Sequence, residues 1–377
     1  MDIFQSHYTT TKGWSDELPD YNSPQTLVLV FGHSSFLEQQ EPFQEIINKY
    51  PDSIIAGCST PAVVLDHKVN KQGVVISVTR FWNTRLRIST REIKPDETPE
   101  TLGKQLAEEI KEDSLSAILT FADGLSINGS QYIQGIDRVA GKTMVVTGGL
   151  AAYCGKPAKS WVLSNGIPKT KTACVIGFYG DSVRFISSHG GGWKAFGPKR
   201  KITRAHNEVL YELDGKPALQ LYKNYLGEAA NDLPKSGLLY PLSIWSDKPE
   251  DNVVRSIMNI DEEAQSISFA GDIPQGVFTR LMYGTLENLI DGAEQAAQNL
   301  QEIYTHNPGI LSIVASCIGR LLVLDDDVEM EVDAVLKKLP DGSRQIGFYS
   351  AGEFATLNQG ACALHNETLA LTVIYEK

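Results

Sequence analysis

The chain of 377 residues is long enough for two or three ordinary domains, and its 42% hydrophobic content is ample for buried cores. Its formal net charge is -12 at pH 7, and its one basic cluster is the GPKRK segment at 197–201. We therefore expect no nucleic-acid partner, because phosphate binding needs a clustered basic surface. No apolar run approaches the roughly 18 residues of a membrane helix, and the N-terminus lacks a signal-peptide pattern. We expect a cytoplasmic protein without membrane insertion.

Five cysteines are spread widely through the chain with no CxxC pair, which favours a reducing compartment and excludes a zinc ribbon. The common enzyme motifs, a GxSxG elbow, a GxxxxGK[ST] loop and an HExxH helix, are absent from the sequence. The acids of the segment 324–331 have no turning glycine for a calcium loop, so they are interpreted as the charged start of a helix.

In chain order, residues 1–25 are polar and rich in turn residues, which predicts a surface lead-in. Continuous apolar runs then predict buried strands, and apolar residues at helical spacing predict helices between them. A helix start is marked by Thr98, Pro99 and Glu100, which supply a cap, a proline at the first helical position and an early acid. The expected strands are 26–32, 53–59, 73–81, 85–93, 115–123, 142–149, 159–166, 171–180, 182–190, 253–261, 266–271, 276–284 and 310–316. The expected helices are 41–50, 98–110, 128–140, 216–227, 285–304 and 327–339.

Three segments of the chain resemble one another. Each has a strand, a helix, a second strand that ends in Gly-x-small, and a further β-branched strand; they begin at LVLVFG, AILTFADG and LSIVASCIG. The pattern predicts an α+β fold with mixed, largely antiparallel sheets flanked by helices. We expect two related lobes that contain internal strand–helix–strand repeats.

The last sixty residues contain the richest pocket chemistry. Arg320 follows a turn of small residues after a buried strand, and Glu353 lies just past another strand end. One interpretation is a zwitterion clamp, in which Arg320 binds a carboxylate and Glu353 an ammonium group. The alternative is a structural ion pair. By the repeat, residues 57–60 occupy the position of 347–350, so both strand ends could line one pocket.

Seven histidines are present, without an i, i+4 pair. A multi-histidine metal site would therefore need distant segments to converge, whereas a haem needs a single axial histidine. His189 and His365 have the most pocket-like settings and are the candidate haem ligands, with a structural role as the alternative for each.

With these residues in place, the chain resembles the FIST family of sensory domains. The N-terminal half is suggested by GCST at 57–60, by GGLAA with WVLSNG, and by GGGWKAFGP; the C-terminal half by SCIGR, GFYSAGEF and LHNETL. The expected division is a lead-in at 1–25, a FIST N-like domain at 26–205 and a FIST C-like domain at 206–377. One departure is that Pro61, Ala62 and Val63 follow GCST, so the glutamate of that turn is absent from the N-terminal copy.

The resemblance implies a sensory module that binds a small, amino-acid-like ligand and signals through a separate partner. Stand-alone bacterial FIST proteins include haem-containing nitric-oxide sensors that regulate a histidine kinase, and a sensor of that kind is a sharper alternative. An enzyme that depends on Cys58 or Cys317 is the alternative of another class. The expected ligand-binding residues are Cys58, Ser59, Thr60, Trp193, Cys317, Arg320, Tyr349, Glu353, His365 and Asn366.

Overall fold

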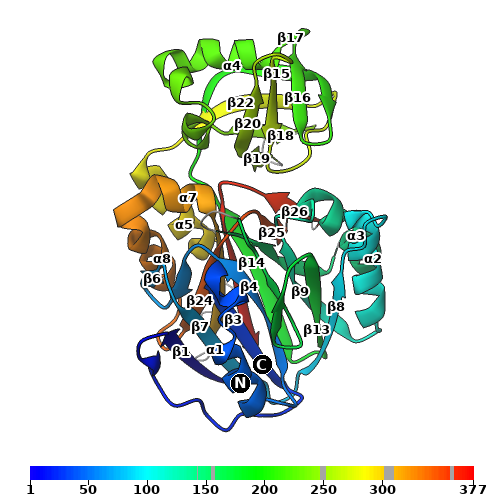
Figure 1. Cartoon of the computed structure of the whole chain (residues 1–377), viewed down its shortest axis with the longest axis vertical. Helices are drawn as coiled ribbons and strands as arrows, with labels where there is room; N and C mark the ends of the chain where they lie inside the picture. Colours follow the sequence, from blue (N-terminus) through cyan, green and yellow to red (C-terminus); the bar gives the residue numbers. More distant parts are fainter. Residues whose placement is uncertain (142, 154–157, 247–251, 301–309, 357–360) are drawn as a thin grey trace.

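The computed structural model describes residues 1–141, 143–153, 158–246, 252–300, 310–356 and 361–377. These residues form two lobes (Figure 1): a large lobe that contains both termini, and a small lobe that lies above it. The small lobe is a single insertion, from about 194 to 283, into the third of three similar units that build the large lobe. In the described parts of the chain, no helix is both long and apolar enough to cross a membrane.

Each unit of the large lobe has the same core: two parallel strands joined through helical structure, then an antiparallel strand beside the first. In the first unit β3 is parallel to β4 and antiparallel to β7; β9, β10 and β13 repeat this arrangement, as do β23, β24 and β27. An outer strand precedes each core and pairs with its last strand, namely β1, β8 and β14. The expected strand–helix–strand repeat is therefore confirmed as three copies in one lobe.

The bounds of the elements are as follows. The first unit contains β1 (Asp2–Thr9), β2 (Gly13–Trp14), β3 (Thr26–His33), η1 (Ser34–Leu37), α1 (Glu41–Lys49), β4 (Ile54–Thr60), β5 (Val63–Leu65), β6 (Lys68–Asn70) and β7 (Val74–Arg80). The second contains β8 (Arg85–Glu92), α2 (Pro99–Ile110), β9 (Leu115–Asp123), α3 (Gly129–Ala140), β10 (Val145–Ala151), β11 (Val162–Ser164), β12 (Ile167–Lys169) and β13 (Thr172–Tyr179). The third contains β14 (Val183–Gly190), α5 (Leu286–Gln298), β23 (Leu311–Cys317), α7 (Ile318–Leu324), η5 (Asp325–Asp327), α8 (Val328–Leu336), β24 (Arg344–Ser350), β25 (Glu353–Thr356), β26 (Cys362–His365) and β27 (Leu369–Glu376).

The three units exchange hairpins in a cycle. The hairpin β5–β6 of the first unit joins the sheet of the third, β11–β12 of the second joins the sheet of the first, and β25–β26 of the third joins the sheet of the second. Each sheet is therefore completed by another unit. This exchange makes the large lobe one body, because no unit holds all the strands of its own sheet.

The inner faces of the three sheets share one apolar core. Its centre is a contact of three phenylalanines, one from each parallel pair: Phe31 stacks on Phe348 at 4.6 Å between ring centroids, and Phe121 meets both edge-on at 5.5 and 5.7 Å. All three side chains are fully buried. Helices cover the outer faces, with α2 packed on α3 and α5 on α8 at equivalent places in two of the units.

A glycine at one repeated position lets each parallel pair approach closely. Gly57 lies opposite Val30, and Gly148 opposite Thr120, with φ of 148° and 135°. A Cβ atom at either glycine would lie 1.8 or 1.9 Å from the facing carbonyl oxygen. Since only glycine avoids that overlap and adopts these φ angles freely, the G of the repeated Gly-x-small pattern is a requirement of strand packing.

The small lobe has an eight-stranded sheet with α4 packed against it. Its elements are β15 (Lys194–His206), β16 (Val209–Leu213), β17 (Lys216–Pro217), α4 (Ala218–Leu226), η2 (Gly227–Asp232), η3 (Lys235–Leu239), β18 (Leu242–Trp245), β19 (Val253–Arg255), β20 (Ile257–Asp261), β21 (Ser266–Phe269) and β22 (Phe278–Tyr283). Consequently the boundary expected between 205 and 206 falls inside β15.

The predicted α+β class, with mixed, largely antiparallel sheets and two lobes, is confirmed. Local signals placed the helices well: the Thr98 side chain caps α2 by accepting from Thr101 N at 3.2 Å, and Gly227 ends α4. The segment expected as a lead-in instead contributes β1 and β2 to a sheet. The turn of small residues expected before Arg320 is wrong, because α7 begins at Ile318 with Cys317 as its cap. Residues 301–304 of the helix expected at 285–304 lie outside the described residues.

Candidate ligand-binding site

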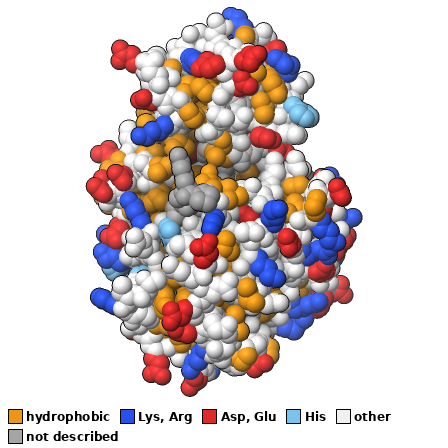
Figure 2. Space-filling view, in the orientation of Figure 1, with side chains coloured by type: hydrophobic (Ala, Val, Ile, Leu, Met, Phe, Trp, Pro, Cys, Tyr) orange, Lys and Arg blue, Asp and Glu red, His pale blue; other side chains and the backbone are white. Residues whose placement is uncertain are grey.

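A cleft of about 360 Å³ lies between the lobes, at the carboxyl ends of the strands of the second and third units. The large lobe contributes the residues that follow β10, β23 and β24, and the small lobe contributes η3 and the start of β20. Figure 2 shows hydrophobic side chains gathered at this waist. Most of the lining is apolar, and it includes Ala152, Pro234, Leu238, Ile257, Met258, Ala270, Ile318, Leu322 and Ala351. An apolar cleft with a few polar groups is the usual form of a small-molecule site.

Directly behind the wall of the cleft lies the carboxylate of Glu367. A Cβ atom added to the cleft residue Gly319 would lie 2.3 Å from Oε1 of Glu367 and 2.5 Å from Oε2, so the wall is one backbone thick. Another cleft residue, Ser256, donates its hydroxyl to Oε1 at 2.6 Å. Among the described residues, Oε2 has no hydrogen-bond partner.

The backbone of Glu367 is also unusual. Its φ is +58°, and it is the one buried residue among the described non-glycine residues with positive φ. Such a conformation costs an L-residue about 1–2 kcal/mol, and strained residues of this kind cluster at ligand sites. Trp193 donates its indole N–H to the carbonyl oxygen of Glu367 at 2.5 Å and so holds this conformation from the connection between the lobes.

A second buried acid, Glu353, lies close to the first. Ser350 and Thr368 donate hydroxyl groups to its two carboxylate oxygens at 2.5 and 2.9 Å. Burial raises the pKa of Glu353 to about 8, with a further contribution from the charge of Glu367. Burial likewise raises the pKa of Glu367 to about 7, against the opposing effects of the Ser256 hydrogen bond and the charge of Arg320. Both acids therefore titrate near neutral pH, which is a common property of functional sites.

The same turn contains further buried polar atoms without partners. Neither the oxygen nor the nitrogen of the Asn366 amide has a hydrogen-bond partner among the described residues, and the same is true of Nε2 of His365. Both side chains are at most 1% exposed. Because buried polar groups in folded proteins are nearly always paired, three consecutive residues with orphaned atoms (365–367) indicate a place where a ligand or ordered water completes the bonding.

The small lobe is held to the large lobe by few polar contacts around this turn. Besides the Ser256–Glu367 hydrogen bond, Arg255 donates to the carbonyl oxygen of Leu364 at 2.8 Å. At the start of α3, Asn128 donates to a carboxylate oxygen of Asp272 at 2.9 Å. Ser256 also lines the cleft, so one of these contacts between the lobes lies at the cleft itself.

Arg320 does not have the role expected in the clamp. Its guanidinium is fully buried and donates to Glu331 Oε1 at 2.5 Å, to the carbonyl oxygens of Gly191 and Leu289 at 2.7 Å, and more weakly to that of Glu367. Each guanidinium nitrogen is thus already bonded within the protein. The structural ion pair, which the sequence left as the alternative, is present, but with Glu331 in place of Glu353.

Tyr349 belongs to the same structural network as Arg320. Its hydroxyl donates to Oε2 of Glu331 at 3.0 Å, and Ser316 donates to the same oxygen at 2.9 Å. Three donors thus bind the Glu331 carboxylate, which is 0% exposed. The sequence treated this acid as one of several at a helix start; no local signal distinguished it from the exposed acids beside it.

Residues 58–60 at the end of β4 lie beside Tyr349 near the end of β24, as the repeat predicts. Their polar groups, however, form hydrogen bonds within the protein. Tyr349 N donates to the Thr60 hydroxyl oxygen at 2.9 Å, and Ser59 donates to the carbonyl oxygen of Ala152 at 2.8 Å. Cys58 lies in the shared apolar core, where burial raises its pKa well above the ordinary value. None of these three side chains lines the cleft.

Cys317 is the expected cysteine that the structure brings to the cleft. Burial and the charges of Glu353 and Glu367 raise the pKa of its thiol well above the ordinary value. A nucleophilic cysteine needs the opposite shift, since the thiolate is the reactive form. The surroundings of Cys58 and Cys317 therefore give no support to cysteine-dependent catalysis.

The two candidate haem ligands lie against each other. The rings of His189 and His365 are 4.3 Å apart between centroids, and burial lowers the pKa of both imidazoles. Neither ring lines the cleft, and no group of three or more potential metal ligands occurs among the described residues. Because the two rings are in contact with each other and neither reaches the cleft, these residues do not fit a haem bound there.

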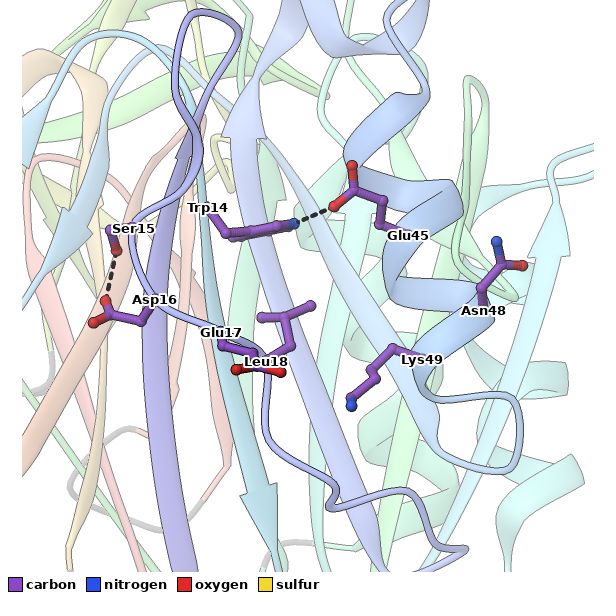
Figure 3. Close-up of a pocket in the computed structure, with 8 residues that line it drawn as sticks. All are labelled: Trp14, Ser15, Asp16, Glu17, Leu18, Glu45, Asn48 and Lys49. Carbon is purple, nitrogen blue, oxygen red and sulfur yellow. Dashed lines mark hydrogen bonds between the residues drawn. The ribbon is translucent and has the colours of Figure 1, made fainter.

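A larger hollow of about 650 Å³ lies at the opposite end of the large lobe, between the β2 loop and α1 (Figure 3). Trp14 donates its indole N–H to Glu45 at 2.9 Å, and Ser15 donates to Asp16 at 2.7 Å. These two pairs bind at an open surface, and none of the described residues that line the hollow has a buried polar side-chain atom without a partner. The hollow is therefore a weaker candidate than the cleft.

Sequence reasoning missed the residues that line the far side of the site. Arg255 and Ser256 stand in the otherwise apolar run VVRSIM, and a buried strand interrupted by an arginine and a serine is a usable signal. Glu367 directly follows the predicted residues His365 and Asn366. It is buried in a turn at a positive φ, and the sequence reveals neither the burial nor the backbone angle.

Comparison with known proteins gives the family. The FIST N domain model matches residues 26–216, and the FIST C domain model matches residues 218–356. The chain belongs to the FIST family. FIST domains are sensory domains that bind small ligands. The two matches meet inside the small lobe, so this FIST protein divides by sequence at a different place from its structural lobes.

This FIST chain is also similar to the uncharacterized protein MJ1623 of Methanocaldococcus jannaschii. The two sequences are 24% identical over 356 residues, which cover 86% of this chain and 65% of that protein. The chain therefore spans less than two thirds of the length of this relative.

Proposed function

We propose that this chain is a sensor in which a small ligand binds in the cleft between the lobes and changes the position of the small lobe. A separate partner protein, such as a histidine kinase, then responds to that position. The observation that supports this function best is the orphaned carboxylate oxygen of Glu367 behind an apolar cleft of about 360 Å³. A protein does not retain a buried, strained and half-satisfied acid for stability, because such a group is destabilising.

The arrangement of the lobes supports a conformational output. The small lobe enters and leaves the large lobe at adjacent points, after β14 and before α5, and the contacts near the cleft include single hydrogen bonds from Ser256 and Arg255. A ligand that alters the Glu367 carboxylate changes the Ser256 bond directly. Ligand binding shifts an equilibrium only through such a difference in contacts between two states.

A cleft-filling variant tests this function before the ligand is identified. Leu322 lines the cleft and is 60% exposed, whereas Met330 is 50% exposed on the neighbouring helix and does not line it. Thermal-shift screening of amines, amino acids, carboxylic acids and alcohols is expected to give ligands that stabilise the wild type and Met330→Trp but not Leu322→Trp. An absence of stabilising compounds, or equal stabilisation of both variants, would count against the proposal.

The haem-based nitric-oxide sensor is the weaker candidate, because the rings of His189 and His365 lie against each other and neither lines the cleft. Reconstitution with haemin separates the two candidates. The cleft function predicts no stoichiometric Soret band, and a band that disappears in His189→Ala or His365→Ala would restore the haem function.

A further inference from the structure

We propose that the ligand of the cleft is a small apolar primary amine whose ammonium group binds to Glu367. This inference rests on the function proposed above and specifies the chemistry of its ligand. The amine follows from the charges and unused hydrogen-bonding groups around the cleft, and the apolar part follows from its lining.

The hydrogen bonds of Glu367 show which kind of partner its carboxylate still lacks. Oε1 accepts from Ser256 at 2.6 Å, and Oε2 accepts from no described residue. A buried carboxylate with a free oxygen is completed best by a charged N–H donor, since hydrogen bonds between ionised groups are roughly twice as strong as neutral ones. A ligand hydroxyl group would supply a donor but no charge.

The charges around Glu367 favour a cation. Glu353, whose pKa burial raises to about 8, is mostly uncharged near pH 7, and the Cys317 thiol beside the two acids stays protonated, so neither supplies a positive charge to Glu367. The two buried arginines are already engaged: Arg320 with Glu331, and Arg255 with the carbonyl oxygens of Leu364 and Asp272. An ammonium group would therefore stabilise the ionised form of Glu367, whose pKa burial raises to about 7.

The same charges disfavour an α-amino acid. Its carboxylate is two bonds from its ammonium group and would therefore enter beside the carboxylate of Glu367. Among the described residues that line the cleft, the one cationic side chain is Lys235, which is exposed on the small lobe. The expected zwitterion clamp relied on Arg320, which is bonded elsewhere.

Access to Glu367 requires a small movement. The carboxylate is 0% exposed and is separated from the cleft by the backbone of Gly319 and the side chain of Ser256. Because Ser256 belongs to the small lobe, a shift of that lobe opens this wall. Binding of the ammonium group and movement of the small lobe are thus the same event.

Three probes of similar shape test the proposal on the full chain: 3-methylbutylamine, leucine and 3-methylbutan-1-ol. Calorimetric titration at pH 7.5 is expected to give an affinity for the amine at least about tenfold above that for leucine or the alcohol. The amine has a net positive charge, whereas leucine also has a carboxylate and the alcohol is uncharged. Glu367→Gln should lower the amine affinity to that of the alcohol. Glu329→Gln, which removes an exposed acid of α8, should leave it unchanged.

The outcomes separate this inference from the function on which it rests. The proposal of an amine ligand would be overturned if leucine bound as tightly as the amine, or if Glu367→Gln left the amine affinity unchanged. The cleft would still be the binding site in either case, provided that Leu322→Trp abolishes binding. Binding that survives Leu322→Trp would overturn both. The comparison of the three probes on the wild type decides the question even where Glu367→Gln does not fold.

Discussion

The buried pair of Arg320 and Glu331 gives a sharp test of why Arg320 is not a ligand-binding residue. Both side chains are 0% exposed, and the Nε–Oε1 distance is 2.5 Å. Glu331→Gln keeps the size of the side chain and removes its charge, which leaves the buried Arg320 guanidinium without its paired carboxylate. Breaking a buried pair in this way costs about 3–5 kcal/mol.

Glu329→Gln is the matched control, because Glu329 lies on the same helix and pairs with Lys68 at 3.0 Å with side chains 43% and 57% exposed. An exposed pair contributes about 0–1 kcal/mol. Urea denaturation followed by circular dichroism measures both free energies of unfolding. If Glu331→Gln costs no more than Glu329→Gln, Arg320 does not depend on Glu331, and its assignment as a structural residue is refuted.

Three further predictions concern the buried acid, the repeated glycine and the contact between the lobes. The pKa of Glu353 is about 8 in the folded protein and 4.5 in a model peptide, so the folded state binds this proton more tightly. The contribution of Glu353 to the free energy of unfolding therefore falls by about 1.4 kcal/mol per pH unit as pH rises from 4.5 to 8. Denaturation at pH 5, 6 and 7 should show that Glu353→Gln removes this part of the slope, and an unchanged slope would exclude the assignment. Gly148→Ala should lower the free energy of unfolding by at least about 3 kcal/mol, because the new Cβ atom would lie 1.9 Å from Thr120 O. The control Gly141→Ala, where there is open space and φ is +78°, should lower it by about 1–2 kcal/mol. Similar losses for both variants in denaturation would argue against the close strand approach. Asn128→Ala should lower the free energy of unfolding by about 1–2 kcal/mol, since Asn128 caps α3 and also donates to Asp272. Hydrogen exchange should become faster both at the start of α3 and around Asp272. Faster exchange confined to α3 would show that the contact between the lobes is unimportant.

Much of the fold followed from local patterns. Apolar runs marked the parallel strands, and caps such as Thr98 marked the helices, because both signals act within a few residues. The exchange of hairpins was not predictable in the same way. The strands β5, β11 and β25 have three or four residues each and pair with a different unit, so nothing in their own sequence identifies the partner strand.

The site was predicted in part. The expected residues His365 and Asn366 lie close to Glu353, because β26 pairs with β25 and sets His365 opposite Glu353; their role in ligand binding stays a prediction. Arg320 was assigned the wrong partner, since Glu331 lies on a helix whose other acids are half-exposed and nothing local sets it apart from them. The residues of the small lobe, such as Ser256, were out of reach because an insertion folds back onto the unit that contains it.

Hydrogen–deuterium exchange with 3-methylbutylamine, or with any compound found by thermal shift, locates the ligand most directly. Binding in the cleft predicts slower exchange in the two segments 255–258 and 317–322, which contribute to its lining, and in 365–368 behind its wall, with unchanged exchange in the hollow around Trp14 and Glu45. Protection confined to that hollow, or to the edge strands of the large lobe, would contradict ligand binding between the lobes.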